Sequence, residues 1–136
     1  MTKAHVFPLR VYCEDTDTGG IVCYANYLRF AERARTKMLR SVGIESAHLM
    51  REDNISLTVK TCQVDYQKPA YLDDALEVHS WIIKVGGASF NGEQKIKCNS
   101  NELVNIQIKL ACMAMGGKPT RLPNKLRSTL NTLCST

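Results

Sequence analysis

The stretch that decides the fold runs from Tyr12 to Val42 and reads YCEDTDTGGIVCYANYLRFAERARTKMLRSV. It opens with an acidic loop that ends in Gly19 and Gly20, and a helical pattern follows immediately. Glycine adopts backbone angles that other residues avoid, so the chain can turn sharply here. The start of a helix presents unpaired N–H groups and a partial positive charge. A loop carboxylate facing such a helix start is suited to attack a polarised carbonyl, or to activate water against it.

A single long helix is predicted over Tyr24–Val42, where apolar residues recur at helical spacing. Gly43 follows in the position that commonly ends a helix. Arg40 lies in the last turn, where a cation opposes the helix dipole. Ala31 and Ala34 are small residues on the apolar side, so this helix can lie close against a sheet.

The rest of the chain predicts mainly strands, with apolar and polar residues alternating over residues 6–13, 55–66, 75–85, 89–98 and 103–115. The alternation changes phase near Lys60, which predicts a bulge or a strong bend. The Gly86–Gly87 pair predicts a tight hairpin turn. Residues 46–54 form either a short helix or a loop, and a final helix over residues 122–133 is expected to begin at Pro123.

One long helix followed by an antiparallel meander predicts an α+β fold. We expect a single domain over residues 1–136, in which a curved antiparallel sheet of about five strands wraps the long central helix. The helix covers one face of this sheet and leaves the other partly exposed. Association with further copies of the chain is therefore expected.

Composition restricts the classes of partner. The hydrophobic share is 44% and the charged share is 23%, which are ordinary values for a globular protein. No apolar run is long enough for a membrane helix, and the first residues do not read as a signal peptide. The net charge of +5 is interspersed along the chain and no aromatic–basic motif accompanies it, so nucleic acid is not expected. A partner that carries phosphates fits the excess of positive charge.

The cysteines and histidines predict neither a disulfide nor a metal site. Six cysteines occur without a Cys-x-x-Cys pair, so they read as free thiols in a reducing compartment, with the cytoplasm as the expected location. The three histidines lie far apart in the sequence and belong to no cluster with ligand spacing. We expect Cys13 and Cys23 to be buried as small hydrophobic residues, not to act as nucleophiles.

Two blocks of sequence resemble a known family. Residues 10–12, 14–17, 20–22, 25–28 and 32–35 read RVY, EDTD, GIV, ANYL and ERAR. Residues 65–66, 68–70 and 73–74 read DY, KPA and DD. Together these blocks resemble the 4-hydroxybenzoyl-CoA thioesterase family, and most closely its YbgC-type branch of acyl-CoA thioesterases. The resemblance spans roughly residues 10–123.

The resemblance implies a hotdog fold, assembly into homodimers or homotetramers, and hydrolysis of short-chain or aromatic acyl-CoA without a cofactor or metal. It implies a site shared between two subunits. The catalytic aspartate of the family falls on Asp17, as nucleophile or general base, and the N–H at the helix start near Tyr24 would polarise the thioester carbonyl. Asp17 also suits a structural role, because aspartate often bonds loop amides ahead of a helix. The ring of Tyr24 is more typical of a core residue.

Further residues are candidates for substrate binding: Gly20, Ile21, Val22, Asn26, Glu32 and Ser89. Asn26 suits helix capping better than substrate contact. By resemblance, Glu32 lies near the acyl pocket of the hydroxybenzoyl branch. Ser89 follows the predicted hairpin and could contact the pantetheine arm, while Lys60 and Lys84 are candidates for phosphate contacts because they are basic.

Two departures from the family pattern leave an alternative open. The YbgC-type branch commonly has Tyr-His where this chain has Cys23 and Tyr24, and a second Tyr where it has Cys13. The hydroxybenzoyl branch carries a basic triplet at the hairpin, where residues 86–88 read GGA. The alternative is a hotdog scaffold that binds acyl-carrier protein or an envelope-associated complex and hydrolyses weakly. The intact Asp17 and both glycines favour the enzyme.

Overall fold

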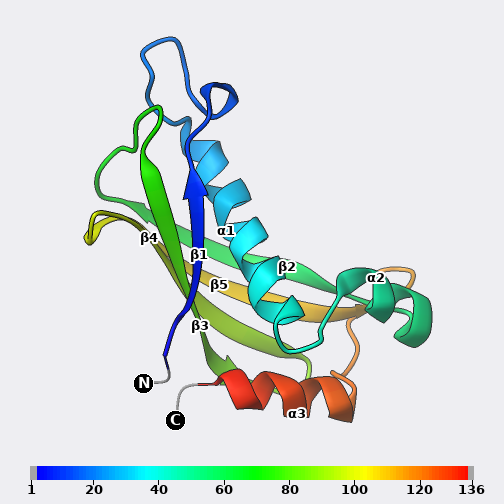
Figure 1. The fold of residues 1–136 in the computed structure, drawn as a ribbon. Helices are drawn as coiled ribbons and strands as arrows, with labels where there is room; N and C mark the ends of the chain where they lie inside the picture. The colour runs from blue at the N-terminus through cyan, green and yellow to red at the C-terminus, as the bar shows by residue number, and fades with distance from the viewer. Residues whose placement is uncertain (1–2, 135–136) are drawn as a thin grey trace.

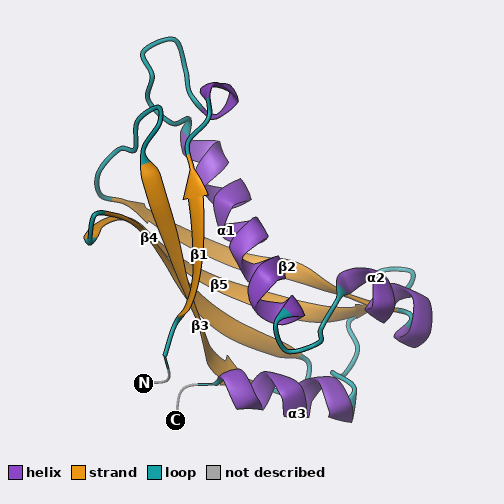
Figure 2. Cartoon of the chain, in the orientation of Figure 1, coloured by secondary structure: helices purple, strands orange, loops and turns teal. Residues whose placement is uncertain are grey.

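A five-stranded antiparallel sheet curves around one long helix in the computed structural model, which describes residues 3–134 (Figure 1). The long helix is α1 (Tyr24–Arg40). The strands are β1 (His5–Arg10), β2 (Ile55–Tyr66), β3 (Ala75–Val85), β4 (Ser89–Cys98) and β5 (Asn101–Ala114). Figure 2 shows the helix lying across one face of the strands. The predicted α+β hotdog fold is confirmed.

Helix α1 packs on the sheet through a stripe of small and aromatic residues. Ala31 and Ala34 are fully buried, so the helix backbone lies close to the strands, and Phe30 fills the space beside them. The helix ends at Arg40, two residues earlier than predicted. Gly43 completes the stop with a positive φ of 84°, and its N–H donates to the Arg40 carbonyl at 3.0 Å.

The strand order is β1-β3-β4-β5-β2, so the predicted meander is only partly correct. Strands β3, β4 and β5 follow one another as hairpins, but β2 pairs with β5 at the far edge. The reason lies in residues 67–74, which cross from β2 to β3 instead of turning back. The Val22 N–H donates to the Ala70 carbonyl at 3.0 Å, and the Ala70 N–H donates to the Tyr27 hydroxyl at 2.9 Å. These bonds hold the crossover against the start of α1.

Strand boundaries follow the predictions closely, except in β1. The register of β2 shifts between Val59 and Thr61, which confirms the bulge expected near Lys60. Strand β1 ends at Arg10, so its predicted continuation to Cys13 is wrong. The chain leaves the sheet because residues Cys13–Asp15 form a 3₁₀ turn, in which the Tyr12 N–H donates to Asp15 Oδ2 at 2.9 Å.

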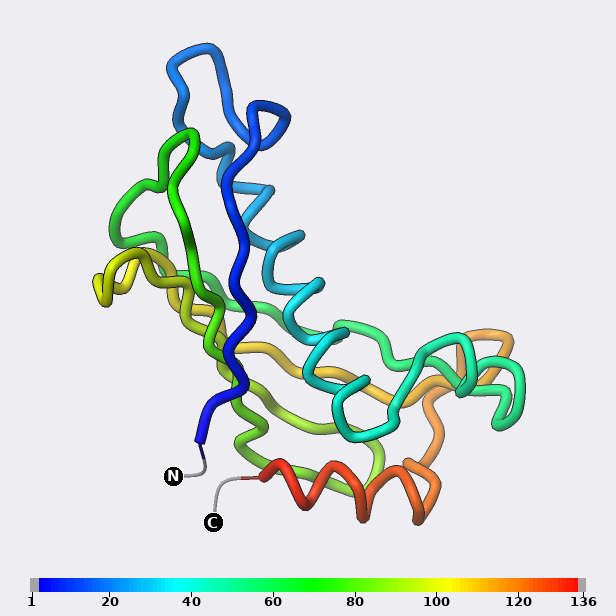
Figure 3. Tube along the Cα trace, viewed as in Figure 1, coloured from blue at the N-terminus to red at the C-terminus, as the bar shows by residue number. Residues whose placement is uncertain are grey.

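The remaining helices lie at the end of the sheet opposite the acidic loop (Figure 3). The short helix α2 (Ser46–His48) continues as a wide helical turn over Leu49–Asp53, which decides the open choice for residues 46–54 in favour of helix. Helix α3 (Asn124–Leu133) follows Pro123 and buries Leu126 and Leu130. Cys13, Cys23, Cys62, Cys98 and Cys112 are free thiols. Among residues 3–134, no helix is both long and apolar enough to cross a membrane.

Candidate active site

A pocket of about 720 Å³ opens at the N-terminal end of α1. Its walls come from the acidic loop, the first turn of the helix and the crossover after β2. The lining residues are Asp17, Ile21, Val22, Cys23, Tyr24, Tyr27, Tyr66, Gln67, Lys68 and Pro69. The structure therefore brings Asp17 and Tyr24 together, as the sequence predicted.

The acidic loop fixes the carboxylate of Asp17 through one of its two oxygens. Asp17 Oδ1 accepts hydrogen bonds from the N–H of Gly19 at 2.8 Å and from the N–H of Ile21 at 3.2 Å. The turn that makes this possible needs Gly20, whose φ is +76° and whose N–H donates to the Asp17 carbonyl at 3.1 Å. No donor among the described residues bonds Oδ2. One oxygen thus has the expected structural role, and the other remains available for chemistry.

The first turn of α1 leaves backbone donors open at the pocket. Cys23 is the N-cap residue, but its side chain makes no capping hydrogen bond to the first turn of the helix. Within residues 3–134, no acceptor bonds the Tyr24 N–H. Tyr24 is 73% exposed, so our expectation of a core role for this residue is wrong. An unpaired N–H at the N-terminus of a helix, which is the positive end of the helix dipole, can stabilise a negatively charged oxygen.

Three tyrosines form an aromatic wall beside this N–H. The Tyr66 ring lies edge-on to the Tyr24 ring at 6.0 Å and tilted to the Tyr27 ring at 5.7 Å. The Tyr66 hydroxyl donates to the Tyr24 carbonyl at 3.2 Å, which ties β2 to the first turn of the helix. Burial is the main cause that raises the pKa of both Tyr27 and Tyr66, so both phenols stay neutral near pH 7. Sequence reasoning missed Tyr66, although it stands in the quoted DY block.

The loop segment Gly20–Val22 is held in place by the crossover from β2 to β3. Ile21 pairs with Tyr71 in a short antiparallel bridge, and the Leu72 N–H donates to the Gly20 carbonyl at 2.9 Å. Of the three candidate residues in this segment, Ile21 and Val22 line the pocket and Gly20 forms its turn.

The other substrate candidates lie outside this pocket. Asn26 is buried and does not cap the helix: its side-chain N–H donates to the Asp15 carbonyl at 2.8 Å. Glu32 lines a separate, smaller pocket further along α1. Ser89 lies in the β3–β4 hairpin, where its carbonyl accepts from the Gly86 N–H at 2.7 Å. That hairpin lies beside α3, far from the acidic loop of the same chain (Figure 1).

The thiols and cations near the pocket differ from expectation. Cys13 and Cys23 are exposed, so the prediction that they are buried is wrong, and Cys23 lines the pocket. Lys68 lines the pocket as well, whereas Lys60 and Lys84 do not. No histidine is among the lining residues. Within residues 3–134, no group of three His, Cys, Asp or Glu residues could hold a metal ion.

A carboxylate, an open helix N–H and an aromatic wall in one pocket are consistent with acyl transfer. Residues 11–130 match the Thioesterase-like superfamily. The chain belongs to this superfamily. The thioesterase is 40% identical over 128 residues to the acyl-CoA thioesterase YbgC of Haemophilus influenzae, which covers 93% of this chain and 94% of the relative.

Two further comparisons agree with this membership. The acyl-CoA thioester hydrolase YbgC of Escherichia coli is 39% identical over 122 residues, covering 88% of this chain and 90% of the relative. A solved structure of a probable thioesterase from Bartonella henselae superposes with a TM-score of 0.85 at 34% identity, covering 88% of this chain and 99% of that chain. The protein is therefore an enzyme of the thioesterase class.

Proposed function

We propose that this thioesterase hydrolyses acyl-CoA to the free acid and CoA, with Asp17 as nucleophile or general base. The observation that carries the proposal is the pairing of two groups in one pocket. Asp17 is oriented by two amide donors to Oδ1. Tyr24, whose N–H bonds no acceptor within residues 3–134, lines the same pocket. The relatives named as acyl-CoA thioesterases support this choice of substrate.

Both roles of Asp17 give a balanced reaction. As nucleophile, a carboxylate oxygen attacks the thioester carbon, CoA leaves as a thiolate, and water then hydrolyses the acyl-enzyme anhydride. As general base, Asp17 takes a proton from water while the hydroxyl attacks the carbonyl, and it returns the proton to the departing thiolate. Either route places negative charge on the carbonyl oxygen. One donor such as the Tyr24 N–H stabilises that charge by about 3 kcal/mol.

The pocket walls favour short or aromatic acyl groups. Its volume of about 720 Å³ lies within the range typical of small-molecule sites, about 300–1,000 Å³. Tyr24 and Tyr66 offer ring faces on which an aromatic acyl group can stack, and their hydroxyls can bond a hydroxylated one, such as 4-hydroxybenzoyl. Ile21 and Pro69 add aliphatic surface suited to a short chain.

We propose that the enzyme works as a homodimer or homotetramer. Strand β2 is the last strand of the sheet, and its residues 58–63 are exposed on both faces. An open edge strand of this length favours pairing with another chain. Val59 and Leu28, both exposed apolar residues, would be covered by such a partner. The pocket beside Tyr66, at the end of the same strand, would then be completed by the second copy.

A second candidate substrate is a thioester carried by acyl-carrier protein. The observation that favours it is the basic C-terminal end of the chain, where no Asp or Glu follows Glu102 and the cations are Lys109, Lys118, Arg121, Lys125 and Arg127. The Arg121 guanidinium covers the hairpin, since a Cβ on Gly87 would lie 3.5 Å from Arg121 Nη1. This basic end suits either the phosphates of CoA or an acidic carrier protein.

Thiol release from acetyl-, butyryl-, benzoyl- and 4-hydroxybenzoyl-CoA tests the proposal. We expect turnover of at least one of these substrates, and a loss of about a hundredfold or more in Asp17→Asn, as is typical for a general base or nucleophile. Circular dichroism and thermal unfolding establish that the variant is folded. Near-normal turnover by folded Asp17→Asn, or no turnover of any substrate by the wild type, would contradict the proposal.

A further inference from the structure

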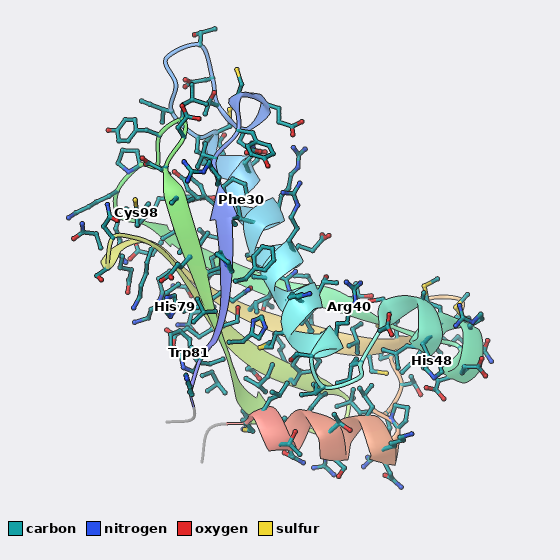
Figure 4. All side chains as sticks on the ribbon, in the orientation of Figure 1. Phe30, Arg40, His48, His79, Trp81 and Cys98 are labelled. Atoms are coloured by element: carbon teal, nitrogen blue, oxygen red, sulfur yellow. The ribbon has the colours of Figure 1, made fainter. Side chains whose placement is uncertain are left out.

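Asn26 is a buried polar residue in the first turn of α1 that the proposed reaction does not use. It is 6% exposed and does not line the pocket of Asp17. Phe30, labelled in Figure 4, follows it by one turn on the same, buried face of the helix. A buried amide normally makes hydrogen bonds, because an unpaired polar group in the interior costs free energy. The bonds that Asn26 makes therefore indicate what this residue does.

The side chain of Asn26 links α1 to the acidic loop. Its Nδ2 donates to the Asp15 carbonyl at 2.8 Å, and its Oδ1 accepts from Arg29 Nη1 at 3.0 Å. Because both ends of the carboxamide are bonded, the orientation of this side chain is fixed. Among residues 3–134, no other side chain of α1 makes a hydrogen bond to the acidic loop. The loop is thus held to the helix by this one amide.

The Asp15 carbonyl is the point where the acidic loop meets the start of the helix. This oxygen also accepts from the Cys23 N–H at 3.1 Å, so both of its lone pairs are used. Asp15 precedes Asp17 by two residues, and Cys23 directly precedes Tyr24. The two donors therefore fix the loop at a point close in sequence to both groups that we propose for catalysis.

A short backbone ladder joins the Asp15 carbonyl to the carboxylate of Asp17. Thr16 and Val22 form an antiparallel bridge, and the Asp17 N–H donates to the Ile21 carbonyl at 2.9 Å. Because these bonds pair the two sides of the loop, the two sides move together. A shift of the loop at Asp15 would therefore carry the Asp17 carboxylate away from its place at the helix start.

We propose that Asn26 is a positioning residue, which sets the place of the Asp17 carboxylate relative to the Tyr24 N–H. This inference rests on the catalytic roles proposed above for these two groups. Asn26 does not line the pocket, so it acts through Asp17 and not on the substrate. A misplacement of about 1 Å can cost about a hundredfold in rate, so loss of the bond to Asp15 should lower kcat. The walls that bind the substrate keep their residues, so KM should change little.

The first test is the kinetics of Asn26→Leu, which nearly keeps the size of the side chain but removes its hydrogen bonds. On a thioester that the wild type hydrolyses, kcat should fall at least about tenfold, while KM should change less than about twofold. The matched control is Ser80→Ala, which removes another buried hydrogen bond, from Gln94 Nε2 at 2.9 Å, outside the pocket. Its kcat should stay at the wild-type value. An unchanged kcat in Asn26→Leu, or an equal loss in Ser80→Ala, would overturn the proposal.

A double-mutant cycle shows whether Asn26 acts through the carboxylate of Asp17. Substitutions in residues that act as a unit are not additive. Asn26→Leu should therefore cost at least about tenfold in kcat in the wild type, but less than about twofold in the Asp17→Asn background. The same loss in both backgrounds would contradict the positioning role. A large loss in Asp17→Asn with no effect of Asn26→Leu would remove this inference alone, whereas near-normal turnover by Asp17→Asn would remove the proposed function and this inference with it.

Amide resonances check the geometry without any substrate. The N–H groups of Gly19 and Ile21 donate to Asp17 Oδ1, so their resonances should shift in Asn26→Leu and stay in place in Ser80→Ala. If Asn26→Leu does not fold, Asn26→Ala replaces it in all three measurements, because alanine suits a helix. Unchanged Gly19 and Ile21 resonances in the folded variant would contradict the proposal.

Discussion

The two ends of α1 use the same helical backbone for different purposes. At the C-terminal end, Gly43 and Ile44 donate back to the carbonyls of Arg40 and Leu39 at 3.0 and 2.9 Å, and Met38 and Ile44 are buried. At the N-terminal end, the N-cap Cys23 makes no side-chain cap, and Tyr24 is largely exposed. One end is closed by its own chain and the other is left open.

This difference shows where stability and chemistry are located. Satisfied carbonyls and buried side chains stabilise the fold, but they leave nothing to bind a reacting group. An open N–H beside an oriented carboxylate contributes little to the fold, yet it offers a donor to a developing oxyanion. We therefore expect substitutions along the buried stripe to change the free energy of unfolding. Those at the open end should change turnover instead.

The largest expected effect comes from placing a charge in the buried stripe. Ala34 is fully buried between α1 and the sheet, so Ala34→Glu should lower the free energy of unfolding by about 4 kcal/mol or more. Tyr24→Glu puts the same side chain in the exposed first turn of α1. A negative charge there interacts favourably with the positive end of the helix dipole, so the free energy of unfolding should change little. Urea unfolding compares the two. Equal losses would remove the distinction between the two ends.

A smaller effect, on turnover, is expected when the hydrogen bond from the Tyr66 hydroxyl to the Tyr24 carbonyl is removed at the open end of α1. Tyr66→Phe keeps the ring but loses the hydrogen bond to the Tyr24 carbonyl, which is worth about 1 kcal/mol, or about fivefold in kcat. The Tyr24→Phe variant is the control, because the Tyr24 hydroxyl makes no hydrogen bond within residues 3–134 and its N–H survives. On butyryl-CoA, Tyr24→Phe should stay near wild type. If Tyr24→Phe lost activity and Tyr66→Phe did not, the anchoring role would be wrong.

A still smaller effect, on stability alone, is expected when the pH falls. Nδ1 of His5 is buried and has no hydrogen-bond partner among residues 3–134. Burial, with Lys37 as a second cause, lowers the pKa of His5. The unfolded chain then binds more protons than the folded one, so stability is complete above the unfolded pKa of about 6.5 and decreases as pH falls below it. Urea unfolding from about pH 7.5 to about pH 5 should show a shallower decrease in His5→Gln. The same slope in both proteins would exclude His5 as its source.

Local patterns in the sequence were enough to predict much of the closed end and the outline of the open end. Helical spacing placed α1, Gly43 marked its stop, and the phase change near Lys60 located the bulge in β2. Each of these signals depends on neighbouring residues alone. The resemblance to the thioesterase family assigned Asp17 and Tyr24 to one site, and the short acidic loop that joins them agrees with that assignment.

Contacts between distant segments could not be predicted. Alternation shows which residues share a face of a strand, but it does not identify the neighbouring strand, so the pairing of β2 with β5 was missed. Tyr66 reaches the Tyr24 carbonyl across 42 positions of sequence, and no local pattern signals that bond. Cys13 and Cys23 were expected to be buried, but the acidic loop extends from the sheet and leaves both exposed.

The most direct test of the open helix end is the amide resonance of Tyr24. A ketone analogue of acyl-CoA, in which a methylene replaces the thioester sulfur, keeps the carbonyl but cannot be hydrolysed. When it binds, the Tyr24 amide proton should move downfield as it donates to the carbonyl oxygen, while the amide of Gly43 at the closed end stays unchanged. Binding of the analogue with no change at Tyr24 would contradict the claim that this N–H polarises the substrate.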